Sequence, residues 1–253
     1  MHEGHRARIR AAYRVSGLDG LPDHNVLELL LTYAIPRRDV NETAHLLMTR
    51  FGSLDGVLAA SVSDLMTVAG VGEQAAVFLH LIHDVNKRIT LQSMSDKGGK
   101  VSLMTPQQAC QYALTLAQVD RYETLRLICL DSYMRVLHAD VLAVGNLSCV
   151  ALEPRHVIEI ALQQKARFLI LTHNHPSGVI LPSEDDKRAA ELIADVCTKL
   201  GIDVRDQLIL GKSAAYSYQY DKVFQFNSPT VCNTITLDAY RELLHAQARQ
   251  LLS

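Results

Sequence analysis

Two histidines and a carboxylate follow an apolar segment closely enough to act together. His173 and His175 come directly after the apolar run 168–171, and Asp186 follows a turn. Side chains alternate along a β-strand, so residues two apart point to the same side. If the run is a strand, both imidazoles share one side, and the first turn of the next helix can bring Asp186 back over the strand end. Two imidazoles and one carboxylate make a zinc site with one position open for water.

Such a site would carry out hydrolysis. Zinc lowers the pKa of its bound water to about 7, so hydroxide is available at neutral pH. A nearby glutamate would take the proton and pass it to the leaving group. The letters His173-Asn174-His175 do not indicate an HNH-type nuclease, because those motifs spread their histidines over a ββα unit.

The same residues have a purely structural interpretation. Ser183 and Asp186 have the spacing of a capping box at the start of a helix, which accounts for both without a metal. A His-x-His pattern on its own is common. The cap does not account for two histidines at a strand end beside the turn residues Pro176 and Gly178. The residues by themselves leave the metal site and the plain cap open.

Hydrophobic spacing predicts the elements that position these residues. Residues 1–92 have helical periodicity and no strand-like alternation, whereas the segment 93–103 is polar and Gly-rich. The part beyond it mixes strand-like and helical patterns, with a hairpin at 124–130 and 136–144 and a helix at 184–200. We therefore predict an α/β protein with a helical domain, a linker, a mixed α/β domain and a helical tail, at 1–92, 93–103, 104–225 and 226–253.

Bulk properties limit the function classes. The chain has 253 residues, a formal net charge of −2 and 48% hydrophobic residues, so we expect a globular protein and not a polyanion binder as a whole. Its five cysteines are isolated, which argues against a disulfide framework and favours a reducing cytoplasm. The charged start lacks an apolar segment after it, and no apolar run reaches 18 residues. We expect neither a secretory signal nor a membrane span.

Two sets of motifs resemble one known family. His-x-His, seven residues, Ser, two residues, Asp is the motif of JAMM (MPN-type) metalloproteases, and the fuller string His173-Asn174-His175-Pro176-Ser177-Gly178 with Pro182-Ser183 resembles the RadC (UPF0758) family. The N-terminal half resembles that family's N-terminal domain, which is helix-hairpin-helix-like. The resemblance covers roughly residues 5–220, and the matching segments there include Leu27-Glu28-Leu29-Leu30, Arg50-Phe51-Gly52-Ser53-Leu54 and Gly70-Val71-Gly72-Glu73.

The resemblance implies a zinc-dependent metallopeptidase or isopeptidase with a cytidine-deaminase-like JAMM domain, acting on an amide bond of a peptide or protein. It implies that the zinc ligands are His173, His175 and Asp186. It gives Ser183 a hydrogen bond to the metal water or to the tetrahedral intermediate, an oxyanion-type role. The family's catalytic glutamate lies early in the first strand of the domain, which makes Glu123 the expected general base.

Three further positions bear on that expectation. Glu153 and Glu159 are rival bases, although Glu159 lies inside a predicted helix and is more simply a surface charge. RadC-like chains commonly have Asp-His where this chain has Asp206-Gln207. If that histidine supports the ligands from behind, its loss would weaken metal affinity or activity. An inactive scaffold that binds a peptide in the same groove is a further hypothesis.

The glycines of the N-terminal half suggest a second site. Gly70-Val71-Gly72 resembles the hairpin of a helix-hairpin-helix module, in which backbone amides approach a phosphate. A plain turn between helices is the alternative. Residues 1–90 hold nine Arg or Lys and ten Asp or Glu, and DNA affinity comes mainly from phosphate neutralisation. We expect at most weak DNA binding here, so a DNA repair or recombination factor is the alternative function. Oligomeric state and substrate identity stay open.

Overall fold

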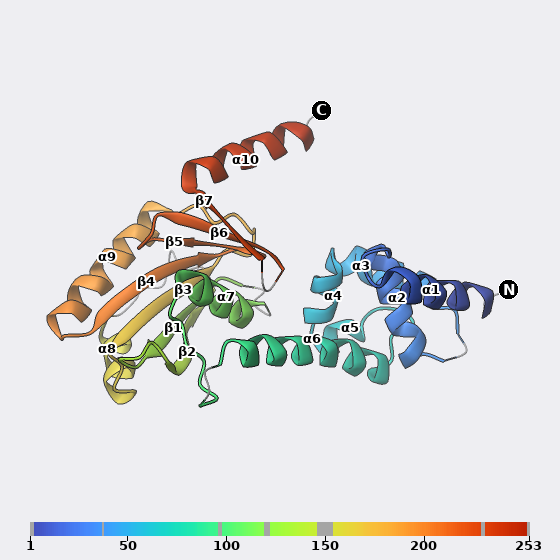
Figure 1. Cartoon of the computed structure of the whole chain (residues 1–253), viewed down its shortest axis with the longest axis horizontal. Coiled ribbons are helices and arrows are strands. Elements are labelled where there is room, and N and C mark those ends of the chain that lie inside the picture. Colours follow the sequence, from blue (N-terminus) through green and yellow to red (C-terminus); the bar gives the residue numbers. More distant parts are fainter. Residues whose placement is uncertain are drawn as a thin grey trace. The chain divides into compact units, whose positions relative to one another are not determined.

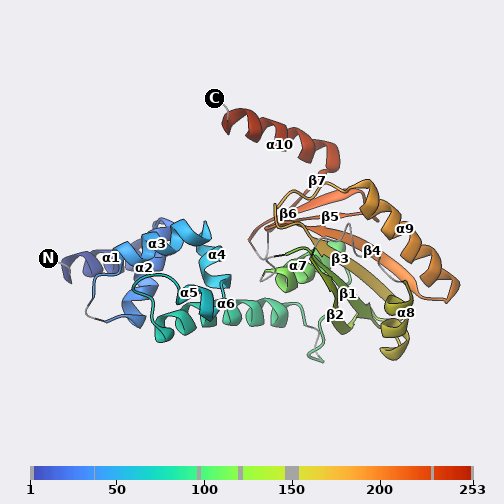
Figure 2. The same ribbon diagram turned by 180° about the vertical axis from the view of Figure 1, so that it is seen from behind.

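The computed structural model describes residues 3–36, 38–95, 98–118, 122–145, 154–228 and 231–251. The chain divides into two compact units, Met1–Ile89 and Thr90–Ser253, which Figures 1 and 2 show from opposite sides. Among the helices so described, none is both long and apolar enough to cross a membrane.

The first unit is helical throughout its described residues, as its hydrophobic spacing predicts. The helices from α2 to α6 bury apolar side chains in a common core, whose fully buried leucines are Leu27, Leu31, Leu47, Leu65 and Leu79. Serine caps start two of the short helices, because Ser53 Oγ accepts from Gly56 N–H and Ser61 Oγ from Asp64 N–H. The helices are α1 (Glu3–Ser16), α2 (Asp23–Ala34), α3 (Asn41–Phe51), α4 (Leu54–Ala59), α5 (Val62–Leu65) and α6 (Glu73–Ser93).

The second unit is built on a seven-stranded sheet with the order β2-β1-β3-β4-β5-β6-β7. Only β3 and β4 pair in parallel, and the other neighbours are antiparallel. This confirms the mixed α/β class and the predicted hairpin. The strands are β1 (Thr124–Leu130), β2 (Val136–Val144), β3 (Phe168–Asn174), β4 (Asp203–Leu210), β5 (Ala214–Ser217), β6 (Lys222–Ser228) and β7 (Val231–Thr236).

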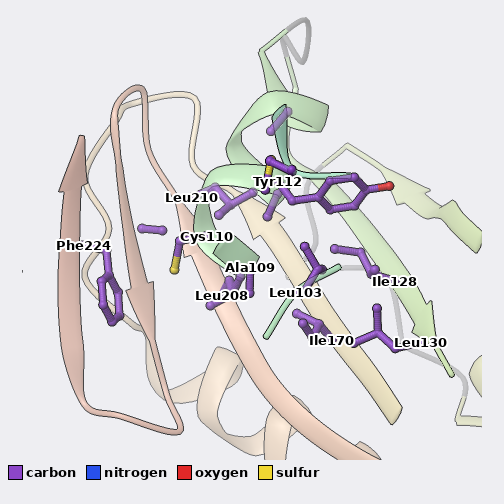
Figure 3. Close-up of a cluster of buried hydrophobic side chains, with 14 residues drawn as sticks. Leu103, Ala109, Cys110, Tyr112, Ile128, Leu130, Ile170, Leu208, Leu210 and Phe224 are labelled. Carbon is purple, nitrogen blue, oxygen red and sulfur yellow. The ribbon is translucent and has the colours of Figure 1, made fainter. Parts of the chain in front are cut away.

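Helices cover both faces of this sheet. On one face, α7 (Pro106–Ala117) packs against Ile128, Ile170 and Leu208, a cluster shown in Figure 3. On the other face, α8 (Pro154–Gln163) and α9 (Glu184–Lys199) pack against Leu169 and Leu171. Because side chains alternate along β3, His173 lies on the same face as Leu169 and Leu171. The strand pattern thus directs His173 toward the side on which α9 lies.

The C-terminal region differs from the predicted helical tail at 226–253. The sheet continues through β6 and β7, and only α10 (Leu237–Leu251) is helical. The side chains of β7 are mostly exposed, so this edge strand lacks the apolar alternation from which strands are predicted. The boundary between the two units falls at Ile89, near the end of α6, and so precedes the polar segment 93–103 that we predict as a linker. That segment forms an isolated bridge from Ser102 to Arg135.

Candidate metal centre

Three candidate ligand atoms converge at the C-terminal end of β3. His173 is in β3, and the N–H of His175 donates to Leu210 O at 2.8 Å, which extends the pairing with β4 past the strand end. His173 Nε2 lies 3.0 Å from His175 Nε2 and 3.2 Å from Asp186 Oδ1. The three ligand atoms lie within 4.8 Å of one another, and no other such group of His, Cys, Asp or Glu occurs among the residues described.

The donor set and its dimensions fit a zinc ion. A tetrahedral zinc with bonds of about 2.0–2.1 Å to nitrogen holds neighbouring ligand atoms roughly 3.3 Å apart. The separations of 3.0 Å and 3.2 Å around His173 Nε2 are close to this ligand-to-ligand distance. Two imidazoles and one carboxylate leave one of four positions open, which is the pattern of catalytic rather than structural zinc sites.

A tight turn orients His175. Gly178 N–H donates to His175 O at 2.8 Å, which closes a turn over Pro176 and Ser177. Gly178 has a φ of +82°, a backbone conformation that glycine adopts without steric cost. Beyond the turn, Val179 O lies 2.6 Å from His175 Nδ1. A proton on Nδ1 satisfies this contact and leaves the lone pair on Nε2, the nitrogen that faces His173.

The helix cap and the carboxylate ligand belong to one arrangement. Ser183 Oγ accepts from Asp186 N–H at 3.1 Å, and Ser183 N–H donates to Asp186 Oδ2 at 2.8 Å, which completes a capping box. Ser183 O–H also donates to Asp186 Oδ2 at 2.6 Å. Since both bonds engage Oδ2, the other oxygen, Oδ1, is the one directed at His173. The two interpretations that the sequence leaves open are therefore compatible, because the cap orients the carboxylate.

The electrostatics of the cluster keep His173 neutral. Burial lowers the pKa of His173 to about 4, an effect that His175 reinforces and that the charges of Asp186 and Glu123 oppose. An imidazole with this pKa carries no charge at neutral pH, so it can offer a lone pair to a cation without first losing a proton.

Glu123 immediately precedes β1, near enough for its charge to affect His173. Its charge raises the pKa of His173, and the backbone around it is fixed by Asn174. Asn174 Nδ2 donates to Tyr122 O at 3.0 Å, and Asn174 Oδ1 accepts from Thr124 N–H at 2.7 Å. Asn174, the residue between the two histidines, thus forms hydrogen bonds with the backbone on both sides of Glu123.

The hydrogen bonds of Asn174 to the backbone of Tyr122 and Thr124 were not predicted from the sequence. The available signal was an amide side chain on the face of β3 opposite to His173, where an apolar residue would be expected. Asn174 is 5% exposed, and a buried amide needs partners. Those partners lie some fifty residues away in sequence, so only the sheet pairing reveals them.

The other sequence candidates lie in different surroundings. Glu153 is outside the residues that the structure describes. Glu159 is on the exposed side of α8 and pairs with Arg155 at 2.8 Å, as expected for a surface charge. Gln207 in β4 pairs with Leu171 of β3, two residues before the pair formed by Ile209 and His173.

The glycine hairpin at Gly70–Gly72 belongs to the first unit, and its two glycines can offer only backbone groups to a ligand. Gly70 has a φ of +86°, and a Cβ there would lie 2.6 Å from Thr43 Oγ1, so this position requires glycine for the fold. Val71 is buried in the helical core. Gly72 precedes α6, and a Cβ built on it would meet nothing within 4 Å. The turn thus explains Gly70 and Val71, whereas packing does not require glycine at position 72.

Comparison with known proteins agrees with the motifs. A family described as "RadC-like JAB domain" matches residues 103–223. The chain is 30% identical to a UPF0758 protein of Fusobacterium nucleatum over 86% of its length and 95% of the relative. It is 33% identical to a UPF0758 protein of Ruegeria pomeroyi and 31% identical to one of Rhodobacter capsulatus, over 85% and 83% of its length and 95% and 97% of those relatives. By its motifs, its sheet and its relatives, the chain belongs to the RadC (UPF0758) family.

Proposed function

We propose that this protein is a zinc-dependent metallohydrolase of the JAMM type that cleaves an amide bond, as a metallopeptidase or isopeptidase. The observation that carries the proposal is the convergence of His173, His175 and Asp186 on one point, with His175 and Asp186 each oriented by a further partner. A bound zinc would supply Lewis acidity, which activates water and polarises a carbonyl group.

The ligands are held before any ion arrives. His175 is oriented by Val179 O and Asp186 by the capping box, and burial favours the neutral form of His173. A site whose donors already point inward loses little conformational entropy on binding, which favours tight binding. We assign all three residues to metal binding.

Glu123 is the general base and then the general acid. It takes the proton of the attacking water and gives it to the leaving amine, so that one carboxylate serves both steps. Asn174 fixes the backbone at Tyr122 and Thr124, on either side of Glu123, which supports this assignment.

Ser183 would stabilise the oxyanion that forms during attack. In the structure its O–H donates to Asp186 Oδ2. Rotation about the Cβ–Oγ bond would turn this O–H to a substrate oxygen, while Oγ still accepts from Asp186 N–H and the backbone bond to Oδ2 persists. The substrate is a peptide or protein.

The experiment is a peptidase screen of zinc-loaded protein with Glu123→Gln and a matched control, Glu159→Gln. General acid–base catalysis contributes about 10²–10⁴-fold, so Glu123→Gln should lose activity by that factor and still bind zinc. Glu159→Gln should hydrolyse as the wild type does, because Glu159 pairs with Arg155 on the surface. Equal hydrolysis by both variants, or a wild type that cleaves no peptide or isopeptide in its zinc-loaded form, would contradict the proposal.

A further inference from the structure

Helix α6 has a second apolar face besides the one that it buries. At 21 residues α6 is the longest helix of the described chain (Figure 1). Its buried face packs into the core of the first unit through Ala75, Ala76, Leu79 and His83. Four further apolar side chains of the helix are each about half exposed, namely Val77 (48%), Leu81 (53%), Val85 (47%) and Ile89 (58%).

These four residues form one continuous row, here called the α6 stripe. They are spaced four apart, and residues four apart in a helix are neighbours on its surface. Each residue turns the helix by about 100°, so Leu81, two residues from both Leu79 and His83, points away from the buried face. With a rise of about 1.5 Å per residue, the α6 stripe is about 18 Å long. A helix at the surface normally has a single apolar face, so the second one indicates a partner.

Two charged residues near the ends of the α6 stripe indicate what this partner is. Glu73 begins the helix, and Arg88 lies beside Ile89 at the other end. Both side chains are exposed, and neither forms an ion pair within the described part of the chain. A partner helix that offers apolar side chains with a base at one end and an acid at the other would complement the α6 stripe.

A second copy of α6 meets this requirement when it lies antiparallel. With the two Leu81 side chains in contact, Val77 of each copy faces Val85 of the other. Glu73 lies eight residues before Leu81 and Arg88 seven residues after it, so the same register brings Glu73 of each copy level with Arg88 of the other to within about 1.5 Å along the axis. A parallel pair would instead place like charges side by side, which is unfavourable.

We propose that the α6 stripe is a self-association surface, on which a second copy of this chain packs its own α6 antiparallel. Four half-exposed side chains per copy cover less than the area of about 800 Å² per partner that a stable interface typically buries. The association should therefore be weak and depend on concentration, with a dissociation constant in the micromolar range.

Sedimentation equilibrium of the full chain tests the proposal, over protein concentrations from about 1 to 200 µM, a range suited to a micromolar dissociation constant. The wild type should shift from monomer to dimer across this range. Leu81→Glu should stay monomeric, because it places two carboxylates together at the centre of the interface, and its thermal midpoint should not fall, because Leu81 is exposed. The matched control is Leu192→Glu, at a leucine of α9 that is 50% exposed, and it should associate as the wild type does.

Reversing the end charges tests the antiparallel register. Glu73→Arg should weaken association severalfold, because it places two cations together at each end of the interface. The double variant Glu73→Arg/Arg88→Glu should restore association to the wild-type level, because it exchanges the two charges of each pair.

The outcomes bear on this surface separately from the metal centre. A wild type that stays monomeric up to the highest concentration would overturn the proposal, and so would a dimer that Leu81→Glu leaves intact. A double variant that associates no better than Glu73→Arg would overturn the antiparallel register. None of these measurements depends on zinc, so each result leaves the test of the proposed function unaffected.

Discussion

Two glycine-containing turns attract attention in the sequence, and they differ in what they bring together. At the turn His175–Gly178, side chains of β3, of the turn itself and of α9 meet, with nitrogen and oxygen atoms 3.0–3.2 Å apart. The turn at Gly70–Gly72 joins two helices of the first unit and offers backbone, beside the acidic Glu73. A metal-binding motif requires its ligand atoms to lie close together, and a structure can confirm or contradict this. A pair of glycines is compatible with any tight turn and therefore tests little.

The largest expected effect concerns two neighbouring acids in the first turn of α9. Asp186→Asn should weaken zinc binding by more than about 100-fold, because it removes the charge of the carboxylate that we propose as a zinc ligand. Asp185→Asn is the matched control, since Asp185 is exposed and pairs with Arg188 at 3.3 Å. Isothermal titration of metal-free protein with zinc measures both. Similar zinc affinities of Asp186→Asn and Asp185→Asn would mean that the turn at His175–Gly178, like the glycine hairpin, brings no metal ligands together.

Asp206 is a buried carboxylate with structural partners, on the other face of the sheet from His173. Burial raises the pKa of Asp206 to about 6, against hydrogen bonds that lower it. Between pH 4 and 6 the folded protein holds this proton more tightly than the unfolded chain, so the stability linked to Asp206 is full below about pH 4 and is lost as pH rises through 6.

Asp206→Asn should remove this dependence. Relative to the variant, the wild type should lose on the order of 2 kcal/mol of unfolding free energy between pH 4 and 7. Urea denaturation at both pH values measures the difference, and Asp203→Asn, at a half-exposed position, is the control. A difference between wild type and Asp206→Asn that does not change with pH would contradict the assignment.

Substitutions at the two hairpin glycines should differ in their effect on the stability of the protein. Gly70→Ala should destabilise the protein by about 1–2 kcal/mol, because alanine is strained at a φ of +86° and its Cβ would clash with Thr43 Oγ1. Gly72→Ala should change stability by less than about 0.5 kcal/mol, since nothing surrounds the added Cβ. Chemical denaturation tests both.

DNA binding by the hairpin stays a prediction of weak affinity. If the hairpin approaches phosphate, Gly72→Ala should reduce any binding to branched DNA at low salt without loss of stability. Binding unaffected by this change would show that the hairpin is not the contact, and strong binding would contradict the predicted weak affinity.

Two capping boxes give a small expected effect on stability and a matched pair of variants. Ser183→Ala and Thr105→Ala should each cost about 1 kcal/mol of stability, because each removes an N-cap that accepts from the third helical residue. Only Ser183→Ala should also weaken zinc binding, because only its helix carries a ligand. Thermal melts and zinc titration of both variants provide the comparison. Equal zinc affinity in both would mean that the cap does not orient Asp186.

The sequence allowed most of the fold and the ligand cluster to be predicted, and the misses have physical causes. His173 and His175 are two apart at a strand end, and Asp186 has a fixed place in a helix cap, so local periodicity suggested that they converge. Their assignment as ligands, against a plain helix cap, came from the family resemblance. Long-range pairing was not available, which is why the hydrogen bonds of Asn174 to the backbone around Glu123 were missed. The exposed edge strand β7 lacked alternation and was taken for part of a helical tail.

The central claim is that His173, His175 and Asp186 hold one cation, and elemental analysis of purified protein after zinc loading and desalting tests it most directly. We predict one zinc per chain in the wild type and none in a His173→Ala/His175→Ala variant that remains folded by circular dichroism. A wild type without zinc, or a double variant that retains as much zinc as the wild type, would contradict the claim.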